Sequence, residues 1–273
     1  MDKMNSKALK PYLSVLDIFQ NKNVLSIISM IIFLLLWDFI VVRGIAGSYL
    51  PRPIEVFDRF LYILKNPLAG KTLVGHLLIS LKRVFIAFII AVIFGIPIGV
   101  LMGFNQYARA IMKPVFDLFK PMPPIAWISL AILWFGIGET SKVFIIFIGS
   151  FVPIVVNSYN GIRLVEPELY DAIRILGADY WQEHLEVTFP GSFPAIFAGM
   201  QISLSIGWTC VLAAELVGAR EGIGFIIVMG MNVGNVAQII VGMLVIAAVA
   251  FLLSVGLNYL ERKVCPWKKQ IET

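Results

Sequence analysis

The chain has 273 residues, of which 59% are hydrophobic and only 14% are charged. Soluble domains carry about 25% charged residues, so this composition excludes an ordinary soluble domain and indicates a protein embedded in a bilayer. The formal net charge of +5 is typical of the basic loops that orient a membrane protein, and we infer no nucleic-acid partner from it. Two cysteines, Cys210 and Cys265, are too few for a disulfide framework or a metal cluster.

Six apolar segments are each long enough to cross a bilayer as a helix, which takes about 20 residues. They cover 24–42, 84–104, 121–138, 143–162, 187–214 and a final helix near 236–257. Because these runs are apolar on every face, they predict helices and exclude membrane strands of alternating polarity. The expected fold class is all-α, a polytopic membrane protein with six transmembrane helices. The first run could also be a secretory signal peptide, although it exceeds the usual apolar core of about 7–15 residues.

The distribution of lysine and arginine favours a cytoplasmic N-terminus. With that orientation the cytoplasmic segments hold thirteen of the 22 basic residues and the outer segments hold nine. The predicted organisation is a tail over 1–23, one membrane domain over 24–260 and a second tail over 261–273, with both tails in the cytoplasm.

The long outer loop after the first span predicts an amphipathic helix over 53–65. Pro53 suits a first helical turn, and one face gathers apolar residues. That face comprises Val56, Phe57, Phe60, Leu61 and Leu64. Such a helix would lie on the membrane, and a solvated loop helix is the alternative. The following Gly70-Lys71-Thr72 resembles the end of a phosphate-binding loop, but the required glycine is replaced by Lys65, so we expect no ATP hydrolysis by this chain.

Glycines and prolines shape the predicted spans. Gly95, Gly99 and Gly103 recur every four residues and form a narrow seam for another helix. The partner helix could belong to the same subunit, which we favour, or to a second copy. Pro97 in the same span, and Pro123 with Pro124 at the start of the third, predict kinks or helix starts.

Polar groups in the fifth span are candidates for a pathway through the membrane. Ser205, Trp208 and Thr209 share a helical face, and Ser203 lies close by. In lipid such groups should face protein or water, so this face either contacts another helix or lines a pathway. No Lys or Arg lies deep in any predicted span. A passing anion or zwitterion would therefore meet only dipoles, hydroxyls and aromatic rings.

Two carboxylates lie near the outer ends of predicted spans. Asp38 is expected to sit in the interfacial region and pair with Arg43 or Arg220. Glu215 is the candidate for an external gate or docking contact, with simple interfacial pairing as the alternative.

The cytoplasmic segment between spans four and five predicts two short helices bent at a glycine. Pro167 suits a first helical turn, and Gly177 stands where the helix must stop and reverse, with a positive φ. Asp179 with Gln182 predicts the cap of a second helix, which runs until Pro190 opens the fifth span. The first helix carries an apolar ridge of Leu169, Ala172, Ile173 and Leu176. We call residues 163–189 the knob.

Enzyme signatures are absent from the sequence. It contains no HExxH, no GxSxG and no metal-spaced set of histidines and cysteines. The two histidines, His76 and His184, fall on opposite sides of the membrane in the predicted topology. The sequence therefore disfavours a membrane enzyme.

The knob resembles the cytoplasmic "EAA" loop of permease subunits of bacterial ATP-binding-cassette importers. Its triplet reads Asp171-Ala172-Ile173, its glycine is Gly177, and its closing residues are Val187-Thr188-Phe189-Pro190. Two of the three triplet positions depart from the consensus. The resemblance extends over nearly all of residues 24–267.

Further stretches are similar to the nitrate, sulfonate and taurine branch of these permeases. They are 120–127, 134–142 and Ala213-Ala214-Glu215-Leu216. The close of the chain, from Glu261 to Trp267, is most similar to the taurine permeases. The resemblance implies a five-helix type I importer core over 80–260, preceded by one extra N-terminal span, with a coupling helix in the knob.

The resemblance also implies partners. Apart from membrane lipid, they are a second copy of this chain in a homodimer, two cytoplasmic ATPases that grip the knobs and an external substrate-binding protein. ATP and magnesium would be bound by the ATPases, so no cofactor is expected in this chain. A multi-pass location in the bacterial plasma (inner) membrane follows from the same resemblance.

Two sets of site residues follow from the resemblance and the spans. The ATPase-coupling set is Glu166, Asp171, Ala172, Ile173, Leu176, Gly177, Ala178 and Pro190. The pathway set is Met122, Pro123, Trp127, Ser203, Ser205, Trp208, Thr209 and Glu215. The knob carries a surplus of acids, so the groove that receives it should have basic edges.

The favoured cargo is taurine or another alkyl sulfonate. Nitrate, bicarbonate or a small aromatic precursor are alternatives within the same importer class. The alternative of another class is a secondary transporter or channel without an ATPase. Such a protein would have no use for a glycine-bent knob, and we would expect an ionisable residue at its midplane for ion coupling.

Overall fold

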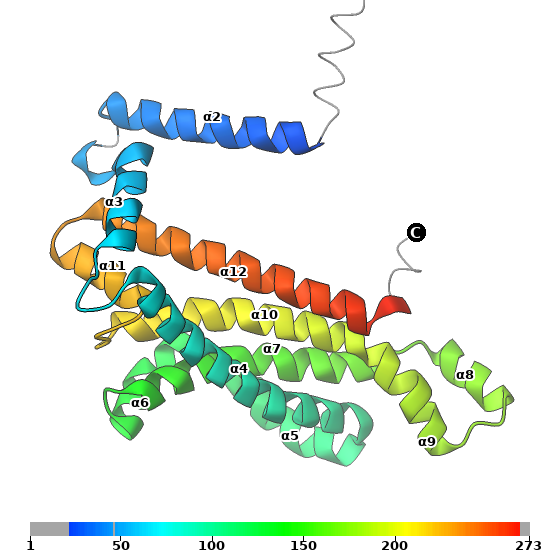
Figure 1. Ribbon diagram of the computed structural model, residues 1–273. Helices are drawn as coiled ribbons and strands as arrows, with labels where there is room; N and C mark the ends of the chain where they lie inside the picture. The colour runs from blue at the N-terminus through cyan, green and yellow to red at the C-terminus, as the bar shows by residue number, and fades with distance from the viewer. Residues whose placement is uncertain (1–21, 46, 268–273) are drawn as a thin grey trace, which may run out of the picture.

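The computed structural model describes residues 22–45 and 47–267, which form helices and short connections (Figure 1). Most of the predicted N-terminal tail, and the last residues of the predicted C-terminal tail, lie outside this part of the chain. The main helices are α2 (Lys22–Val42), α3 (Pro53–Lys65), α4 (Leu73–Phe104), α5 (Gln106–Phe119), α6 (Ile128–Phe135), α7 (Glu139–Arg163), α8 (Pro167–Ile175), α9 (Tyr180–Gln182), α10 (Phe189–Leu216), α11 (Ile223–Asn232) and α12 (Val236–Val264). Short 3-10 turns cover Gly47–Tyr49 and Pro124–Trp127, and a π-helical turn covers Glu183–Thr188.

The all-α prediction is confirmed. Five helices are long and apolar enough to cross a membrane, and a sixth span is made if the bent pair Gln106–Phe119 and Pro124–Phe135 is counted as one. The two parts of that pair meet at 86°. The predicted third span, 121–138, is therefore wrong as a single helix. Prolines at 121, 123 and 124 remove three backbone donors within four residues, so α5 stops before them and a new helical turn begins at Pro124.

Two other predicted spans have different bounds. The second begins at Leu73 and not at residue 84, because His76, Ser80 and Arg83 are buried against protein groups and do not face water. The predicted second short helix of the knob and the fifth span form one run over Tyr180–Leu216. The π turn joins them: the Phe189 N–H donates to the His184 carbonyl five residues back, and Pro190 follows in the first turn of α10.

The core of the bundle is built by α4, α7 and α10, which pack side by side (Figure 1). The glycine seam of α4 lies against α7 of the same chain. A Cβ added at Gly95 would lie 2.8 Å from Ile154 Cγ2, and one at Gly103 would lie 2.7 Å from Ile162 Cβ. This contact confirms the favoured interpretation of the seam as packing within one subunit.

The amphipathic helix after the first span is confirmed as α3, and protein covers part of its apolar face. Val56 and Ile63 are buried in a cluster with Ile223, Ile226 and Val241 of α11 and α12. Phe57 and Leu64, predicted for the same face, are exposed. Figure 1 shows α2 standing apart from the bundle, with a gap between it and α12.

Candidate functional site

The knob has the two-helix form that the sequence predicts. α8 ends at Ile175 with Leu176 as its C-cap, and Gly177 follows with a φ of +84°, a conformation that glycine adopts without strain. Asp179 then caps the next helix: its carboxylate accepts from the Gln182 N–H at 2.8 Å, and the Gln182 side chain accepts from the Asp179 N–H at 2.9 Å.

Side-chain contacts tie α8 to the base of α10. The Arg174 guanidinium donates two hydrogen bonds to the Glu183 carboxylate, at 2.9 and 2.7 Å. These bonds raise the pKa of Arg174, so it is charged at any physiological pH. The Tyr170 and Thr188 hydroxyls share a hydrogen bond of 3.0 Å. The knob is thus fastened to the long Tyr180–Leu216 helix at two points and can move with it as one body.

A second set of contacts joins the knob to α4. The Phe104 ring, at the end of α4, lies 4.8 Å from the His184 ring and 5.6 Å from the Phe189 ring, measured between centroids. A cavity of about 410 Å³ lies below α8, and Asp171 and Arg174 contribute to its wall. The end of α4 therefore packs against the turn that joins the knob to α10.

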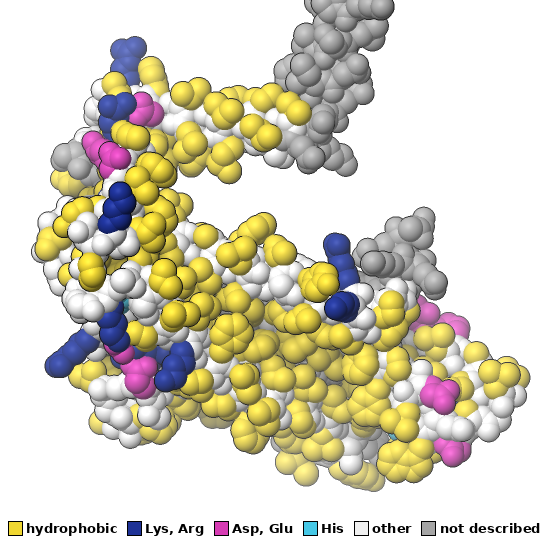
Figure 2. All heavy atoms as spheres, viewed as in Figure 1, with side chains coloured by type: hydrophobic (Ala, Val, Ile, Leu, Met, Phe, Trp, Pro, Cys, Tyr) yellow, Lys and Arg dark blue, Asp and Glu magenta, His cyan; other side chains and the backbone are white. Residues whose placement is uncertain are grey.

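The outer surface of the knob is apolar at its tip and acidic around it. Ile175 and Leu176 are 86% and 85% exposed, and Trp181 is 70% exposed. Figure 2 shows acidic side chains gathered over α8 and α9. Of the predicted ridge, Leu169, Ala172 and Leu176 are exposed, whereas Ile173 is half-buried.

The remaining predicted coupling residues surround this tip. Glu166 precedes α8 as its N-cap and is exposed, Ala178 is half-buried after the bend, and Pro190 lies at the first turn of α10. Sequence reasoning missed Ile175 and Trp181. The signal that could have found Trp181 is a large aromatic residue inside an otherwise charged loop.

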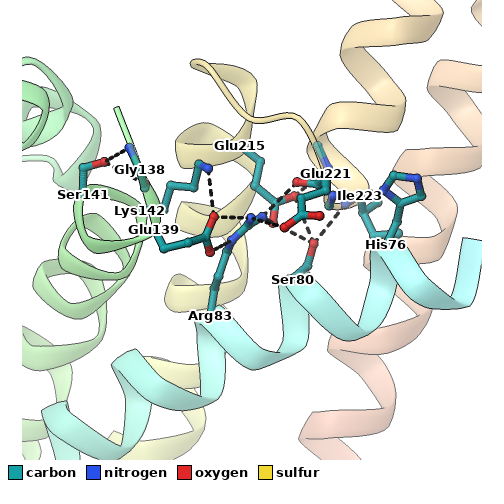
Figure 3. A network of polar contacts seen from close by, with 12 residues as sticks. His76, Ser80, Arg83, Gly138, Glu139, Ser141, Lys142, Glu215, Glu221 and Ile223 are labelled. Atoms are coloured by element: carbon teal, nitrogen blue, oxygen red, sulfur yellow. Dashed lines mark hydrogen bonds and ion pairs between the residues drawn. The ribbon is translucent and has the colours of Figure 1, made fainter. Parts of the chain in front are cut away.

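At the other end of the bundle, a set of charges centred on the buried Arg83 and Glu215 joins four segments (Figure 3). The Arg83 guanidinium on α4 is fully buried and donates two hydrogen bonds of 2.6 Å to Glu139 of α7. It also donates to the Glu215 carboxylate of α10 at 2.6 Å and to the Glu221 carbonyl at 3.0 Å. Lys142 donates to Glu139 at 3.1 Å. Arg83, which the sequence places in the outer loop, thus lies inside the helix of the second span because α4 begins at Leu73.

These charges are tolerated because they compensate one another. Arg83, Lys142 and Lys71 oppose Glu139, Glu215 and Glu221, three cations against three acids. Lys71 binds Glu221 directly, and this hydrogen bond holds the pKa of Glu221, in the loop after α10, below its usual value. A paired, hydrogen-bonded set of this kind costs far less to bury than an isolated charge. We call these six residues the outer network.

Glu215 has a further partner set at the start of α11 (Figure 3). Three consecutive N–H groups there find side-chain acceptors: Gly222 on His76 Nδ1, Ile223 on Ser80 Oγ and Gly224 on Glu215 Oε2, at 3.1, 2.9 and 2.8 Å. The Ser80 hydroxyl in turn donates to Glu215 at 2.7 Å. Glu215 is thus buried and fully bonded within this chain, and its role as an external gate or docking contact stays a prediction.

The structure divides the predicted polar face of the fifth span. Ser205 and Thr209 are exposed, and the Thr209 hydroxyl donates to the Ser205 carbonyl at 3.1 Å. Trp208 is buried and its Nε1 donates to the Ile246 carbonyl of α12 at 2.7 Å, which is ordinary helix contact. Ser203 is buried as well, and its hydroxyl has no hydrogen-bond partner among the described residues.

The other predicted pathway residues lie at the bend between α5 and α6. Met122 and Pro123 are exposed and Trp127 is half-buried, with its Nε1 lacking a hydrogen-bond partner in the described part of the chain.

Asp38 pairs with Arg52, at 2.9 and 3.0 Å, and not with the predicted Arg43 or Arg220. Within residues 22–45 and 47–267, no group of three or more His, Cys, Asp or Glu side chains could hold a metal ion.

A family model described as the binding-protein-dependent transport system inner membrane component matches residues 95–269. The chain is 36% identical over 237 residues to the taurine transport system permease protein TauC of Escherichia coli (strain K12), with 86% of each chain covered. It is 31% identical to the putative aliphatic sulfonates transport permease protein SsuC of Bacillus subtilis (strain 168), over 88% of this chain and 86% of that protein.

A chain of the solved inward-facing MetNI methionine ABC transporter has the same fold. Its TM-score is 0.58 at 20% identity, over 68% of this chain and 92% of that one. Family match, relatives and fold agree with the resemblance found in the knob. The chain belongs to the binding-protein-dependent transport system inner membrane components, and is therefore the non-catalytic, multi-pass permease subunit of an ABC importer.

Proposed function

We propose that two copies of this chain form the pathway by which taurine or another alkyl sulfonate enters a bacterial cell. ATP hydrolysis in two partner ATPases drives the import, and an external binding protein delivers the cargo. The observation that carries the cargo assignment is the 36% identity to a taurine permease over 86% of this chain. The similarity to a putative sulfonate permease supports the same chemical class.

The cargo is tested in proteoliposomes that hold the complete importer, with the binding protein outside and ATP inside. We expect labelled taurine to accumulate, and unlabelled alkyl sulfonates to compete with it. Nitrate and bicarbonate, the alternatives within the importer class, should not compete at equal concentration. Uptake of either anion in preference to taurine would refute the proposed cargo while leaving the importer class intact.

The knob is the proposed contact with the ATPases. Three features support this role: apolar side chains stand fully exposed at its tip, acidic residues surround them, and hydrogen bonds fasten α8 to α10. An exposed apolar tip with a polar rim is the composition of a protein interface. The proposal implies that the knob, and with it both chain termini, lie on the cytoplasmic side.

Co-purification with the ATPase tests the knob. We expect the parent to bring down the ATPase, and Leu176→Asp combined with Gly177→Pro to lose it, because the first change puts a charge into the apolar contact and the second forbids the positive φ. Val264→Asp is the matched control, an exposed apolar residue at the end of α12. A variant that folds and keeps the ATPase fully would refute the coupling role of the knob.

A further inference from the structure

One edge of α5, the inner half of the broken span, is charged. Its residues follow one another at spacings of four, four and three, which aligns them along the helix. They are Arg109, Lys113, Asp117 and Lys120, and we call them the charged edge. The opposite side of α5 is apolar and exposed. It consists of Tyr107, Ile111, Val115 and Leu118.

Ring contacts place α5 at the depth of the neighbouring spans. The Phe116 ring packs edge-on against Phe151 of α7, with centroids 6.5 Å apart. Phe151 lies midway along α7, twelve residues from either end. Lys113 and Lys120 are within about 6 Å of Phe116 along the helix axis. Both lysines, which the sequence alone assigns to a cytoplasmic loop, therefore lie near the middle level of the bundle.

The described residues leave Lys113, Asp117 and Lys120 exposed at this depth, whereas Arg109, nearer the start of α5, is half-buried and contacts Tyr159 of α7. The Lys113 and Asp117 side chains are 46% and 44% exposed and pair with each other on the same helix. Lys120 is exposed and has no carboxylate partner in the described part of the chain. Charges exposed to hydrocarbon are costly, so at the middle of a membrane they face water or another polar surface. The apolar edge is the side suited to lipid.

We infer that the charged edge of α5 lines the inner half of the translocation pathway, where Lys113 and Lys120 attract the anionic head group of the cargo. This inference rests on the proposed function for its cargo, a small sulfonate. The edge carries three cations and one acid, so its net charge suits an anion. The contact would be weak because the lysines are hydrated, and weak contact allows the cargo to leave. Selection by charge then occurs in this subunit as well as in the binding protein.

The first test measures which edge of α5 meets water, and it does not depend on the cargo. Lys113→Cys, Lys120→Cys and Leu118→Cys are made in the complete importer in proteoliposomes and treated with an anionic, membrane-impermeant methanethiosulfonate present on both sides. The native Cys210 and Cys265 are buried. We expect the two lysine variants to react about ten-fold faster than Leu118→Cys, which lies at the same depth on the apolar edge. Equal rates, or unreactive lysine variants, would overturn the inference.

The second test measures uptake of labelled ethanesulfonate. We expect the double variant Lys113→Gln, Lys120→Gln to lower uptake about ten-fold, with the ATPases still bound, and Lys65→Gln, on the exposed surface of α3, to leave it unchanged. Asp117→Asn should keep or raise uptake, because it removes the one acid of the charged edge. If Asp117→Asn lowers uptake as much as the lysine variant does, the Lys113–Asp117 pair only stabilises the helix and the inference fails.

Lipid composition separates cargo from membrane as the anion that the lysines meet. The measurements are made in uncharged phosphatidylcholine and repeated with added phosphatidylglycerol. A lysine defect in both supports the inference, whereas a defect that requires the anionic lipid would show that the lysines bind lipid head groups and would overturn it. A parent that takes up no sulfonate would refute the proposed cargo, and the thiol reactions would still decide which edge of α5 faces water.

Discussion

Arg83 illustrates how one side chain can hold several segments together. Its guanidinium contacts Glu139, Glu215 and the Glu221 carbonyl, so a residue of α4 joins α7, α10 and the loop that leads to α11. Removing one partner from a buried ionic set leaves the other charges without compensation. The residue therefore determines whether the outer ends of three helices stay together.

Replacing Arg83 with methionine should lower the free energy of unfolding by about 3–5 kcal/mol, because Glu215 would remain buried without its cation. Thermal unfolding of the purified, detergent-solubilised chain measures this loss. The control is Arg52→Met, which breaks an exposed pair with Asp38 and should leave the unfolding temperature nearly unchanged. If the two variants unfold at the same temperature, the outer network does not stabilise the fold.

At the scale of elements, α4 and α7 approach closely because glycines face the contact. A Cβ at Gly99 would lie 2.6 Å from both Ser158 Cβ and the Val155 carbonyl oxygen, which are distances that no real contact allows. The second neighbour is backbone and cannot rotate away. The two helices would have to separate to admit even one methyl group.

Gly99→Ala should therefore destabilise the protein by about 1–3 kcal/mol, despite the higher helix propensity of alanine. Gly256→Ala in α12 is the matched control, since nothing lies within 4 Å of its Cβ position and stability should be unchanged or slightly raised. Chemical unfolding of both variants, followed by tryptophan fluorescence, makes the comparison. Equal stability would mean that the α4–α7 contact is looser than the structure shows.

The elements show what the sequence could and could not predict. Apolar runs predicted five of the spans, and the bend at Gly177 and the cap at Asp179 followed from local turn chemistry. The start of α4 could not be predicted in this way. A lone Arg83 is typical of a loop until its partners, more than 50 residues away in the chain, are known. The depth of α5 was missed for a related reason. Its charges resemble a cytoplasmic loop, and only the contact of Phe116 with Phe151 places them beside the middle of α7.

At the scale of the whole molecule, different kinds of contact hold the two ends of the bundle together. The outer network joins α4 to α10 through the buried Arg83–Glu215 pair and α4 to α7 through the exposed Glu139. The inner end holds α8 to the π turn before α10 through Arg174 with Glu183 and Tyr170 with Thr188. Arg174 is 58% exposed, so its pair with Glu183 contributes less to folding than the buried Arg83–Glu215 pair. Although the inner contacts contribute little free energy to folding, they set the angle of α8 relative to the long helix that it must move.

Arg174→Gln combined with Tyr170→Phe should therefore impair transmission more than assembly. We expect the ATPase to co-purify with this variant as it does with the parent, since the exposed tip at Ile175 and Leu176 is intact. Uptake per ATP hydrolysed should fall about two- to five-fold, because α8 could then pivot without carrying α10 with it. The control pair Arg262→Gln with Tyr107→Phe changes the same side-chain types at exposed positions away from the knob and should leave the ratio unchanged. Loss of the ATPase from the double variant would show that these contacts shape the docking surface itself, and an unchanged ratio would show that α8 needs no fastening to drive the bundle.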